Sequence, residues 1–221
     1  MSAAPLRHAL LSGAGIEHAF GVRGAPGPAD VRRPLQVHGA RVVADGECAA
    51  EPPARADAVV STHRGVAVGV VTADCVPILA AGADGRAVAA IHAGWRGLAQ
   101  GVIEAGIGAL AARAAGARIL AAIGPHVGPC CYEVDEPVLA ALAGRYAHAL
   151  DAALLPSRPG HARLDLGCLA RLALAAAGVE DDAIGALPGA CTACDAQRFH
   201  SYRRDGQRAG RLLHHVRVMK A

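Results

Sequence analysis

The stretch "GVAVGVVTADCVPILAAGADGRAVAAIHAGWRGL", residues 65–98, decides the fold of this chain. Its nearly continuous apolar run at residues 65–74 is typical of a strand buried on both faces. A second apolar run at residues 87–94 predicts another strand, and "GADG" at residues 82–85 predicts the turn between the two. Both runs end in polar side chains, so we expect neighbouring strands whose ends carry functional groups.

Outside this stretch, apolar residues at helical spacing and capping residues predict three helices. They cover 98–115 before Gly116, Asp135 to about Leu150 with Pro137 in the first turn, and 166–177 before Gly178. Short apolar runs predict four further strands, at residues 40–43, 118–124, 183–187 and 210–220. This order is not a regular βαβ repeat and no GxGxxG follows a strand, so we expect an α+β or irregular α/β fold in a single catalytic domain, 1–221.

The composition of the chain excludes several classes of protein. Of its 221 residues, 53% are hydrophobic. This fraction is sufficient for a large buried core and argues against an intrinsically disordered chain. A net charge of +3 without a basic run does not fit nucleic-acid binding. No uncharged stretch is long enough to cross a membrane and no signal peptide is evident, so we expect a cytoplasmic protein. Seven unevenly spaced cysteines argue against a disulfide framework.

Side chains that can do chemistry lie where the predicted strands end. Cys75 follows the first apolar run, His92 lies in the second, and His38 precedes the strand at 40–43. A thiolate and an imidazole can form a nucleophilic pair, and two histidines with one cysteine can hold zinc with one position open. The alternative without chemistry is a small core cysteine beside histidines in turns. These residues alone leave the three interpretations open.

Two further segments are rich in polar side chains. "IGPHVGPCCYEV" (123–134) has a backbone shaped by prolines and glycines, and "CTACDAQRFHSYRRDG" (191–206) contains a CxxC and paired arginines. A CxxC can be half of a zinc ribbon. A second CxxC is absent, and the adjacent Cys130 and Cys131 make a poor second half, so we do not expect a structural zinc here. Arg203 and Arg204 could bind a phosphate or carboxylate, or lie in a solvated turn.

Five motifs resemble those of the YfiH/YlmD family in the same order, from about Gln36 to the C-terminus: "QVHG", "TADCVPIL", "HAGWRGL", "IGPHVGPCCYEV" and "FHSYRRDG" followed by "GR". Members of this family were first described as multicopper polyphenol oxidoreductases (laccases) and later as purine nucleoside phosphorylases. The resemblance implies a mixed, β-sandwich-like core flanked by helices, similar to the catalytic domain of cytotoxic necrotizing factor. The segment before Gln36 is shorter here than in the family.

The resemblance implies a Zn²⁺ site formed by His38, Cys75 and His92. It implies phosphorolysis of adenosine, inosine and S-methyl-5′-thioadenosine, which makes purine nucleosides and phosphate the partners, and an adenosine deaminase activity. Zinc would serve as a Lewis acid and anchor. We expect Asp74 and Glu133 as catalytic residues, although Asp74 could instead accept structural hydrogen bonds. The expected substrate-binding residues are Arg23, Arg96, His126 and Arg203, with Trp95 stacked on a base or packed in the core.

Competing functions start from the same residues. Two histidines and a cysteine also ligate blue copper, usually with an axial methionine, but the chain contains only Met1 and Met219 and no HxH pair, which disfavours copper and a laccase. A cysteine hydrolase would use Cys75 as nucleophile and His92 as base. Some family members resemble peptidoglycan editing factors that act on cell-wall precursors. The sequence leaves the choice of substrate and the oligomeric state open.

Overall fold

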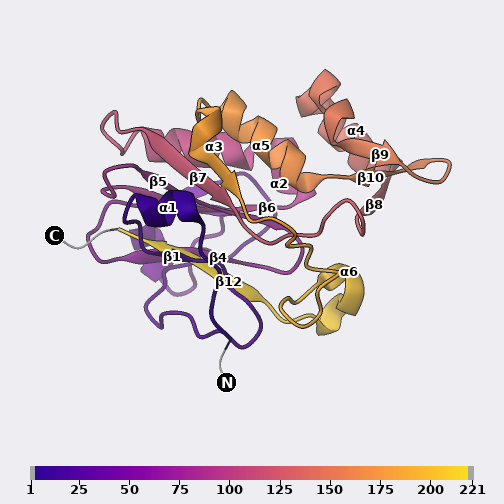
Figure 1. The fold of residues 1–221 in the computed structure, drawn as a ribbon. Coiled ribbons are helices and arrows are strands. Elements are labelled where there is room, and N and C mark those ends of the chain that lie inside the picture. The colour runs from indigo at the N-terminus through magenta and orange to yellow at the C-terminus, as the bar shows by residue number, and fades with distance from the viewer. Residues whose placement is uncertain (1–2, 219–221) are drawn as a thin grey trace.

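The computed structural model describes residues 3–218, and its elements form layers around a mixed six-stranded sheet (Figure 1). The strand order is β11-β7-β5-β6-β3-β2. The middle pairs are antiparallel, whereas β2–β3 and β7–β11 are parallel. The strands are β2 (Val42–Ala44), β3 (Ala58–Ser61), β5 (Val76–Gly82), β6 (Val88–Ala93), β7 (Ile119–Ile123) and β11 (Ile184–Ala186).

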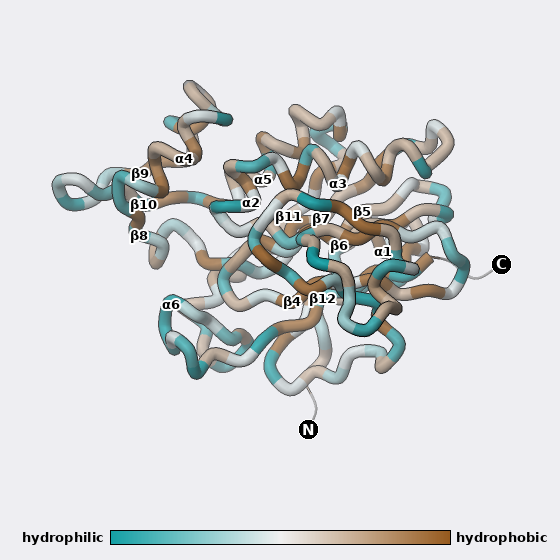
Figure 2. Tube along the Cα trace, turned by 180° about the vertical axis from the view of Figure 1, so that it is seen from behind, coloured by the Kyte–Doolittle hydropathy of each residue, from teal (hydrophilic) through white to brown (hydrophobic). Residues whose placement is uncertain are grey.

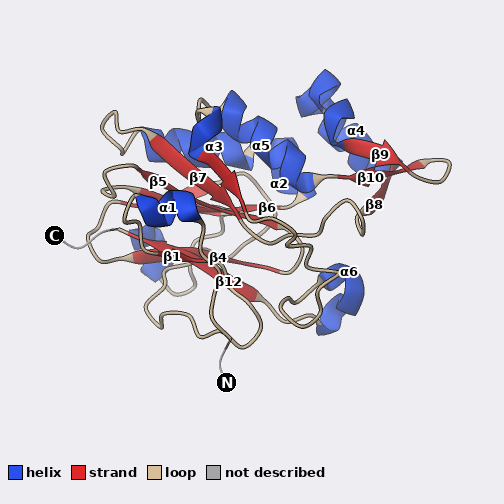
Figure 3. Ribbon diagram, in the orientation of Figure 1, coloured by secondary structure: helices blue, strands red, loops and turns tan. Residues whose placement is uncertain are grey.

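A second sheet covers one face of the six-stranded sheet, and helices cover the other (Figure 3). The second sheet is antiparallel in the order β1-β12-β4, and β4 and β12 pack against β6. Its strands are β1 (His18–Ala19), β4 (Ala67–Thr72) and β12 (Leu212–Arg217). The covering helices are α2 (Trp95–Gln100), α3 (Val102–Ala111) and α5 (Leu166–Ala176). Two facing sheets flanked by helices confirm the predicted mixed, sandwich-like α+β core.

A smaller unit lies to the side of these layers (Figure 1). It consists of a three-stranded antiparallel sheet and the helix that follows its first strand. Its elements are β8 (Glu133–Asp135), α4 (Glu136–Tyr146), β9 (Leu154–Pro156) and β10 (His161–Leu164). Two short helices complete the fold, α1 (Ala9–Gly13) and α6 (Tyr202–Asp205), and single 3-10 turns lie at 45–49, 147–149, 151–153, 181–183 and 206–208.

Small apolar side chains build the core. Every residue of β5 and β6 is buried, and the hydrophobic segments in Figure 2 concentrate in the central strands. Alanines on these strands leave room for helix α3, which approaches so closely at Gly106 that an added Cβ would lie 2.6 Å from Ile91 Cδ1. A chain with few aromatic residues thus fills its interior by close approach of its elements.

The structure corrects the sequence-based assignment around the opening stretch. The strand before the turn at 82–85 is β5, which the sequence reading missed, and β5 rather than β4 pairs with β6. Strand β4 belongs to the second sheet. The segment 65–82 therefore contains two strands in two sheets, and the polar residues Asp74 and Cys75 lie between them instead of at a free strand end.

Other assignments differ in extent. The helix expected over 98–115 is divided into α2 and α3 by Gly101, whose φ of +83° is in the left-handed region. Helix α4 ends at Tyr146, before the expected end near Leu150. Strand β12 covers the middle of the strand expected at 210–220, of which residues 219 and 220 lie outside the described part of the chain. Strands β1, β3, β8, β9 and β10 were not expected from the sequence.

Candidate metal centre

The three predicted ligands His38, Cys75 and His92 come together at one end of the β5–β6 pair. In the antiparallel register Pro77 faces His92 and Val76 faces Ala93, so Cys75, one residue before β5, lies beside the end of β6. One ligand atom from each of the three residues lies within 4.8 Å of the others. Cys75 Sγ is 3.9 Å from His38 Nε2, and the two imidazole rings meet edge to face at 4.8 Å between centroids.

A buried carboxylate behind this group fixes its geometry. Asp57, directly before β3, accepts a hydrogen bond of 2.8 Å from His92 Nδ1. The same carboxylate accepts from the backbone N–H groups of Val37, His38 and Gly39, at 3.2, 2.9 and 2.7 Å for the shortest contact of each. Because Nδ1 donates to Asp57, Nε2 is the nitrogen that can bind a metal once it has lost its proton. Such a carboxylate–histidine pair is the usual outer support of a metal-binding imidazole.

The loop that carries His38 is held in an uncommon backbone conformation. His38 has a φ of +60°, in the left-handed region. The Gln36 amide pairs with the backbone of Val71, donating to its carbonyl at 2.8 Å and accepting from its N–H at 2.7 Å. Together with the N–H groups bound by Asp57, these contacts aim His38 at Cys75.

The donor set and its spacing fit a zinc ion. Two imidazole nitrogens and one thiolate are ordinary zinc ligands, and a tetrahedral centre places sulfur and nitrogen about 3.6 Å apart. The observed 3.9 Å between Cys75 Sγ and His38 Nε2 is close to that value. Gly94 keeps the space open, because a Cβ there would lie 2.9 Å from Cys75 Sγ and 3.2 Å from His38 Cδ2. Three protein ligands leave a fourth position free.

The electrostatics of the group favour an ionised thiol. Burial raises the pKa of Cys75, but hydrogen bonds from His38 and His92 lower it more, to about 6. Burial lowers the pKa of His92, whereas the Asp57 carboxylate and the Cys75 thiolate raise it to about 9. Without metal, the site therefore holds a thiolate beside an imidazolium at neutral pH.

Asp74, a predicted catalytic residue, lies buried next to Cys75 with a φ of +94°. Its Oδ1 accepts from Thr192 Oγ1 at 2.5 Å, and its Oδ2 accepts from Ser201 Oγ at 3.1 Å and from the Arg203 N–H at 2.5 Å. Three donors from the segment 192–203 thus occupy this carboxylate. In this geometry Asp74 connects the segment to the ligand Cys75.

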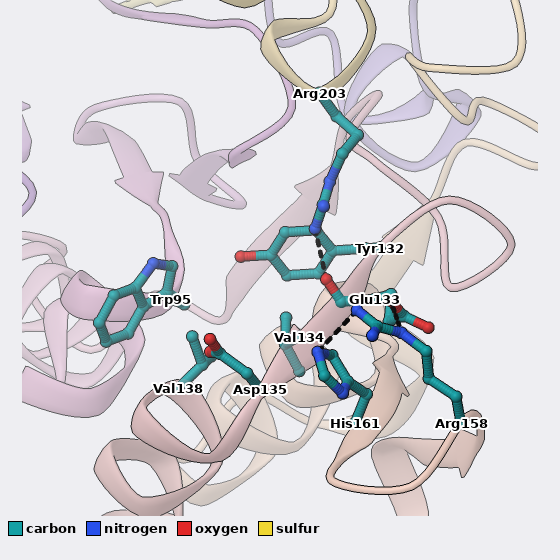
Figure 4. A pocket seen from close by; sticks show the side chains of 9 residues that line it. All are labelled: Trp95, Tyr132, Glu133, Val134, Asp135, Val138, Arg158, His161 and Arg203. Carbon is teal, nitrogen blue, oxygen red and sulfur yellow. Dashed lines mark hydrogen bonds and ion pairs between the residues drawn. The ribbon is translucent and has the colours of Figure 1, made fainter.

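A pocket of about 350 Å³ is lined by several predicted site residues (Figure 4). Arg203 lies over the Tyr132 ring, 5.1 Å from its centroid, and donates to the Glu133 carbonyl. Desolvation and the negative charge of Cys75 raise the pKa of Tyr132 to about 12, which ties the pocket electrostatically to the ligand group. The lining residues are Trp95, Tyr132, Glu133, Val134, Asp135, Val138, Arg158, His161 and Arg203.

The Glu133 side chain turns toward the β9–β10 connection. Its carboxylate accepts from Ser157 Oγ at 2.6 Å and from Arg158 Nε at 3.0 Å. These hydrogen bonds lower the pKa of Glu133, so it is a carboxylate at neutral pH. Arg96, by contrast, is exposed and stacks on Trp95 with 4.3 Å between its Cζ and the ring centroid.

Arg23 and His126 lie outside the residues that line this pocket. The Arg23 guanidinium donates to the Ala196 carbonyl at 2.6 Å. His126 donates from Nδ1 to the Gly124 carbonyl at 2.8 Å. Desolvation lowers the pKa of His126 and keeps its ring neutral.

Sequence reasoning missed the residues that support the ligands. No motif in the sequence includes Asp57, although an acid directly before the apolar run "AVVS" is a usable signal. Gln36 is recognisable only as part of the motif "QVHG". The signals are weak because both side chains act on residues that are distant in the sequence, and their roles become visible once β3 and β4 are placed.

Comparisons with known proteins show the family to which the chain belongs. The profile of the family described as "Multi-copper polyphenol oxidoreductase laccase" matches residues 21–219. A purine nucleoside phosphorylase of Xylella fastidiosa strain Temecula1 is 41% identical over 181 residues, which cover 80% of this chain and 68% of the relative. Purine nucleoside phosphorylase PA4543 of Pseudomonas aeruginosa is 43% identical over 177 residues, covering 80% and 69%.

Solved structures share the fold. Neisseria meningitidis protein NMB0706 superposes with a TM-score of 0.75 at 34% identity, covering 86% of this chain and 75% of that one. YlmD from Geobacillus stearothermophilus gives 0.76 at 32% identity, covering 86% and 74%. The motifs, the fold and the profile match agree, and the chain belongs to the multi-copper polyphenol oxidoreductase laccase family, the YfiH/YlmD family that its sequence motifs indicate.

Proposed function

We propose that this protein is a zinc-dependent purine nucleoside phosphorylase with an adenosine deaminase activity. It would convert adenosine, inosine and S-methyl-5′-thioadenosine, with phosphate, to the free base and the phosphorylated sugar. The observation that carries the proposal is the group of His38, Cys75 and His92, whose ligand atoms lie within 4.8 Å of one another beside a pocket. Zinc held by these three residues would supply a Lewis acid with one open position.

The residues of the pocket suit the two substrates. Trp95 and Tyr132 offer aromatic faces to a purine, and the exposed guanidinium of Arg203 offers donors to phosphate. Arg96 adds a second positive charge over Trp95, and we assign Arg23 and His126 to the outer part of the substrate site. For the proton transfer of deamination we keep Asp74 and Glu133 as the candidates. Each would have to exchange a present hydrogen bond for one to substrate.

The test combines metal analysis with chromatography of each nucleoside, incubated with and without phosphate. We expect base release that requires phosphate, and in Cys75→Ala the loss of phosphorolysis together with the zinc ion bound by His38, Cys75 and His92. Cys168→Ala is the matched control, because Cys168 lies on α5 outside the ligand group. Full phosphorolysis in Cys75→Ala would contradict the zinc site. Stoichiometric copper in the active protein would contradict the choice of metal.

A cysteine hydrolase is the second candidate, and one observation favours it. Asp57, His92 and Cys75 form a carboxylate–imidazole–thiolate series, in which the pKa of Cys75 is lowered to about 6 by its histidine partners despite its burial. A cell-wall precursor would then be a fitting substrate class. Chelation separates the two proposals, because a hydrolase retains its activity in EDTA, whereas the phosphorylase loses it.

A further inference from the structure

Four cysteines outside the metal centre lie close together. Cys130 and Cys131 come from the loop between β7 and β8, and Cys191 and Cys194 come from the loop after β11. All four sulfur atoms lie within 4.8 Å of one another. The Cys194 sulfur is 3.5 Å from that of Cys130 and 3.4 Å from that of Cys131. A zinc ion bound by four thiolates at about 2.3 Å sets its sulfur atoms about 3.8 Å apart. The two distances from Cys194 are slightly shorter than this, and the four sulfur atoms are close enough together to share one ion.

The backbone around the sulfur atoms is arranged as in a binding loop. The Gly128 N–H donates to Cys191 Sγ at 3.2 Å, and the Cys131 N–H donates to the Gly128 carbonyl at 3.0 Å, which closes a tight turn. A Cβ at Gly128 would lie 3.3 Å from Cys130 Sγ, a tight contact, and 3.6 Å from Cys191 Sγ, so the Gly128 backbone packs directly against these sulfur atoms. Hydrogen bonds from backbone N–H groups to sulfur support thiolate ligands from outside the coordination sphere.

We propose that Cys130, Cys131, Cys191 and Cys194 bind a second zinc ion. Four protein ligands leave no open position, so this site is structural, whereas the centre at Cys75 has three ligands. In the sequence, the adjacent Cys130 and Cys131 look unsuited to form one half of a zinc site. In the fold, Cys194 of the distant CxxC lies close to the sulfur atoms of both, so the two adjacent cysteines can share one ion with it.

The position of this four-cysteine cluster suggests what the ion stabilises. Cys131 precedes Tyr132 of the pocket, and Cys191 precedes Thr192, whose hydroxyl binds Asp74 beside the metal centre. The Thr192 N–H also donates to the His126 carbonyl at 3.0 Å, which joins the two cysteine-bearing loops directly. A zinc ion at the cluster would fix both loops and, through them, one side of the candidate active site.

A disulfide is the competing chemistry for these thiols. It would join two of the four sulfur atoms, Cys194 with Cys130 or Cys131, and leave the other two free. Cys194 is almost equally distant from both, and all seven cysteines of the chain are free in the structure. A shared ligand for four sulfur atoms accounts for this arrangement, whereas a single pair does not.

Zinc stoichiometry in protein purified with a thiol reductant tests the proposal. We expect two zinc ions per chain in the wild type, one in Cys194→Ser, one in Cys75→Ala and none in the double variant. Cys168→Ser serves as the control and should keep two. A zinc content in Cys194→Ser equal to that of the wild type overturns the proposal, as does iron in place of zinc at the cluster.

A second measurement covers the case in which Cys194→Ser does not fold. Cobalt(II) is added to metal-depleted Cys75→Ala, which keeps only the cluster. The proposal predicts the strong visible bands and the sulfur-to-cobalt charge-transfer band of a tetrahedral tetrathiolate. A spectrum without these bands overturns it, as does an intact mass after alkylation without reductant that shows a disulfide between cluster cysteines. Both readouts are independent of phosphorolysis, so the proposed function can fail without affecting this result.

Discussion

Among single residues, Asp57 contacts two of the segments that form the candidate centre. Its two oxygens hold His92 through Nδ1 and three successive N–H groups of the loop that carries His38. One carboxylate therefore orients two of the three candidate ligands. Gly94 leaves room for the third, Cys75, because a Cβ at residue 94 would lie 2.9 Å from Cys75 Sγ.

Replacement of Asp57 by Asn should weaken zinc binding by about 10- to 100-fold, the usual effect of removing such an outer partner. Competition with a chromophoric chelator measures the affinity. Asp45→Asn is the matched control, since Asp45 is also buried and binds a histidine, His63, at 2.9 Å, away from the centre. Equal zinc affinity in the two variants would contradict the role of Asp57.

Zinc affinity should also fall as the pH falls. Desolvation lowers the pKa of His92, but Asp57 and Cys75 raise it more, to about 9. Below that pH, zinc must therefore displace a proton from His92. Affinity should drop about tenfold per pH unit from pH 9 to pH 6, and more steeply below the Cys75 pKa of about 6. Chelator competition at several pH values measures the slope, and an affinity independent of pH between 7 and 8.5 would contradict the assignment.

At the scale of elements, helix α3 contains two glycines with opposite environments. Gly106 faces the sheet, where an added Cβ would lie 2.6 Å from Ile91 Cδ1, whereas Gly108 is exposed with nothing within 4 Å of the same position. Gly106 therefore allows α3 to pack closely on β6, whereas no contact requires a glycine at residue 108.

These two positions give a paired prediction. Gly108→Ala should raise the free energy of unfolding by about 0.5–1 kcal/mol, because alanine loses less backbone entropy in a helix. Gly106→Ala should lower it by about 1–3 kcal/mol, because the new methyl group overpacks the helix–sheet interface. Urea unfolding of both variants measures the difference. A stabilising Gly106→Ala would show that α3 can move away from the sheet.

At the scale of the whole molecule, the packing of the two sheets buries a histidine. His214 on β12 is 0% exposed, accepts from the Gly21 N–H at 3.3 Å and contacts Thr72 Oγ1 at 2.9 Å. Desolvation, followed by the nearby His215 and His92, lowers its pKa to about 3.

Among residues 3–218, no helix has the length and apolar character needed to cross a membrane.

The buried His214 predicts acid lability. Its folded pKa of about 3 lies below the ordinary 6.5, so the unfolded chain binds the proton first and stability falls as the pH drops from 6.5 toward 3. The loss is about 2 kcal/mol at pH 5. His214→Gln keeps a donor and an acceptor but does not titrate, and should reduce the pH dependence by that amount. Identical pH profiles of unfolding in the two proteins would contradict this contribution.

The amino-acid sequence is sufficient to indicate the chemistry available to this protein. Apolar runs predicted most strands of the central sheet, apolar spacing and caps predicted the helices, and the motifs indicated His38, Cys75 and His92 as partners and the family to which the chain belongs. These features are local: they depend on residue type, on backbone preference and on order along the chain.

Which of these local features come into contact depends on the three-dimensional fold. It paired β5 with β6, moved β4 to the second sheet, placed Asp57 behind His92, and brought Cys191 and Cys194 to Cys130 and Cys131. Strand pairing and loop contacts between distant segments depend on how all apolar surfaces are buried together, and no short stretch encodes that balance. The physical reason is that a side chain's role here depends on distances in space set by the whole core.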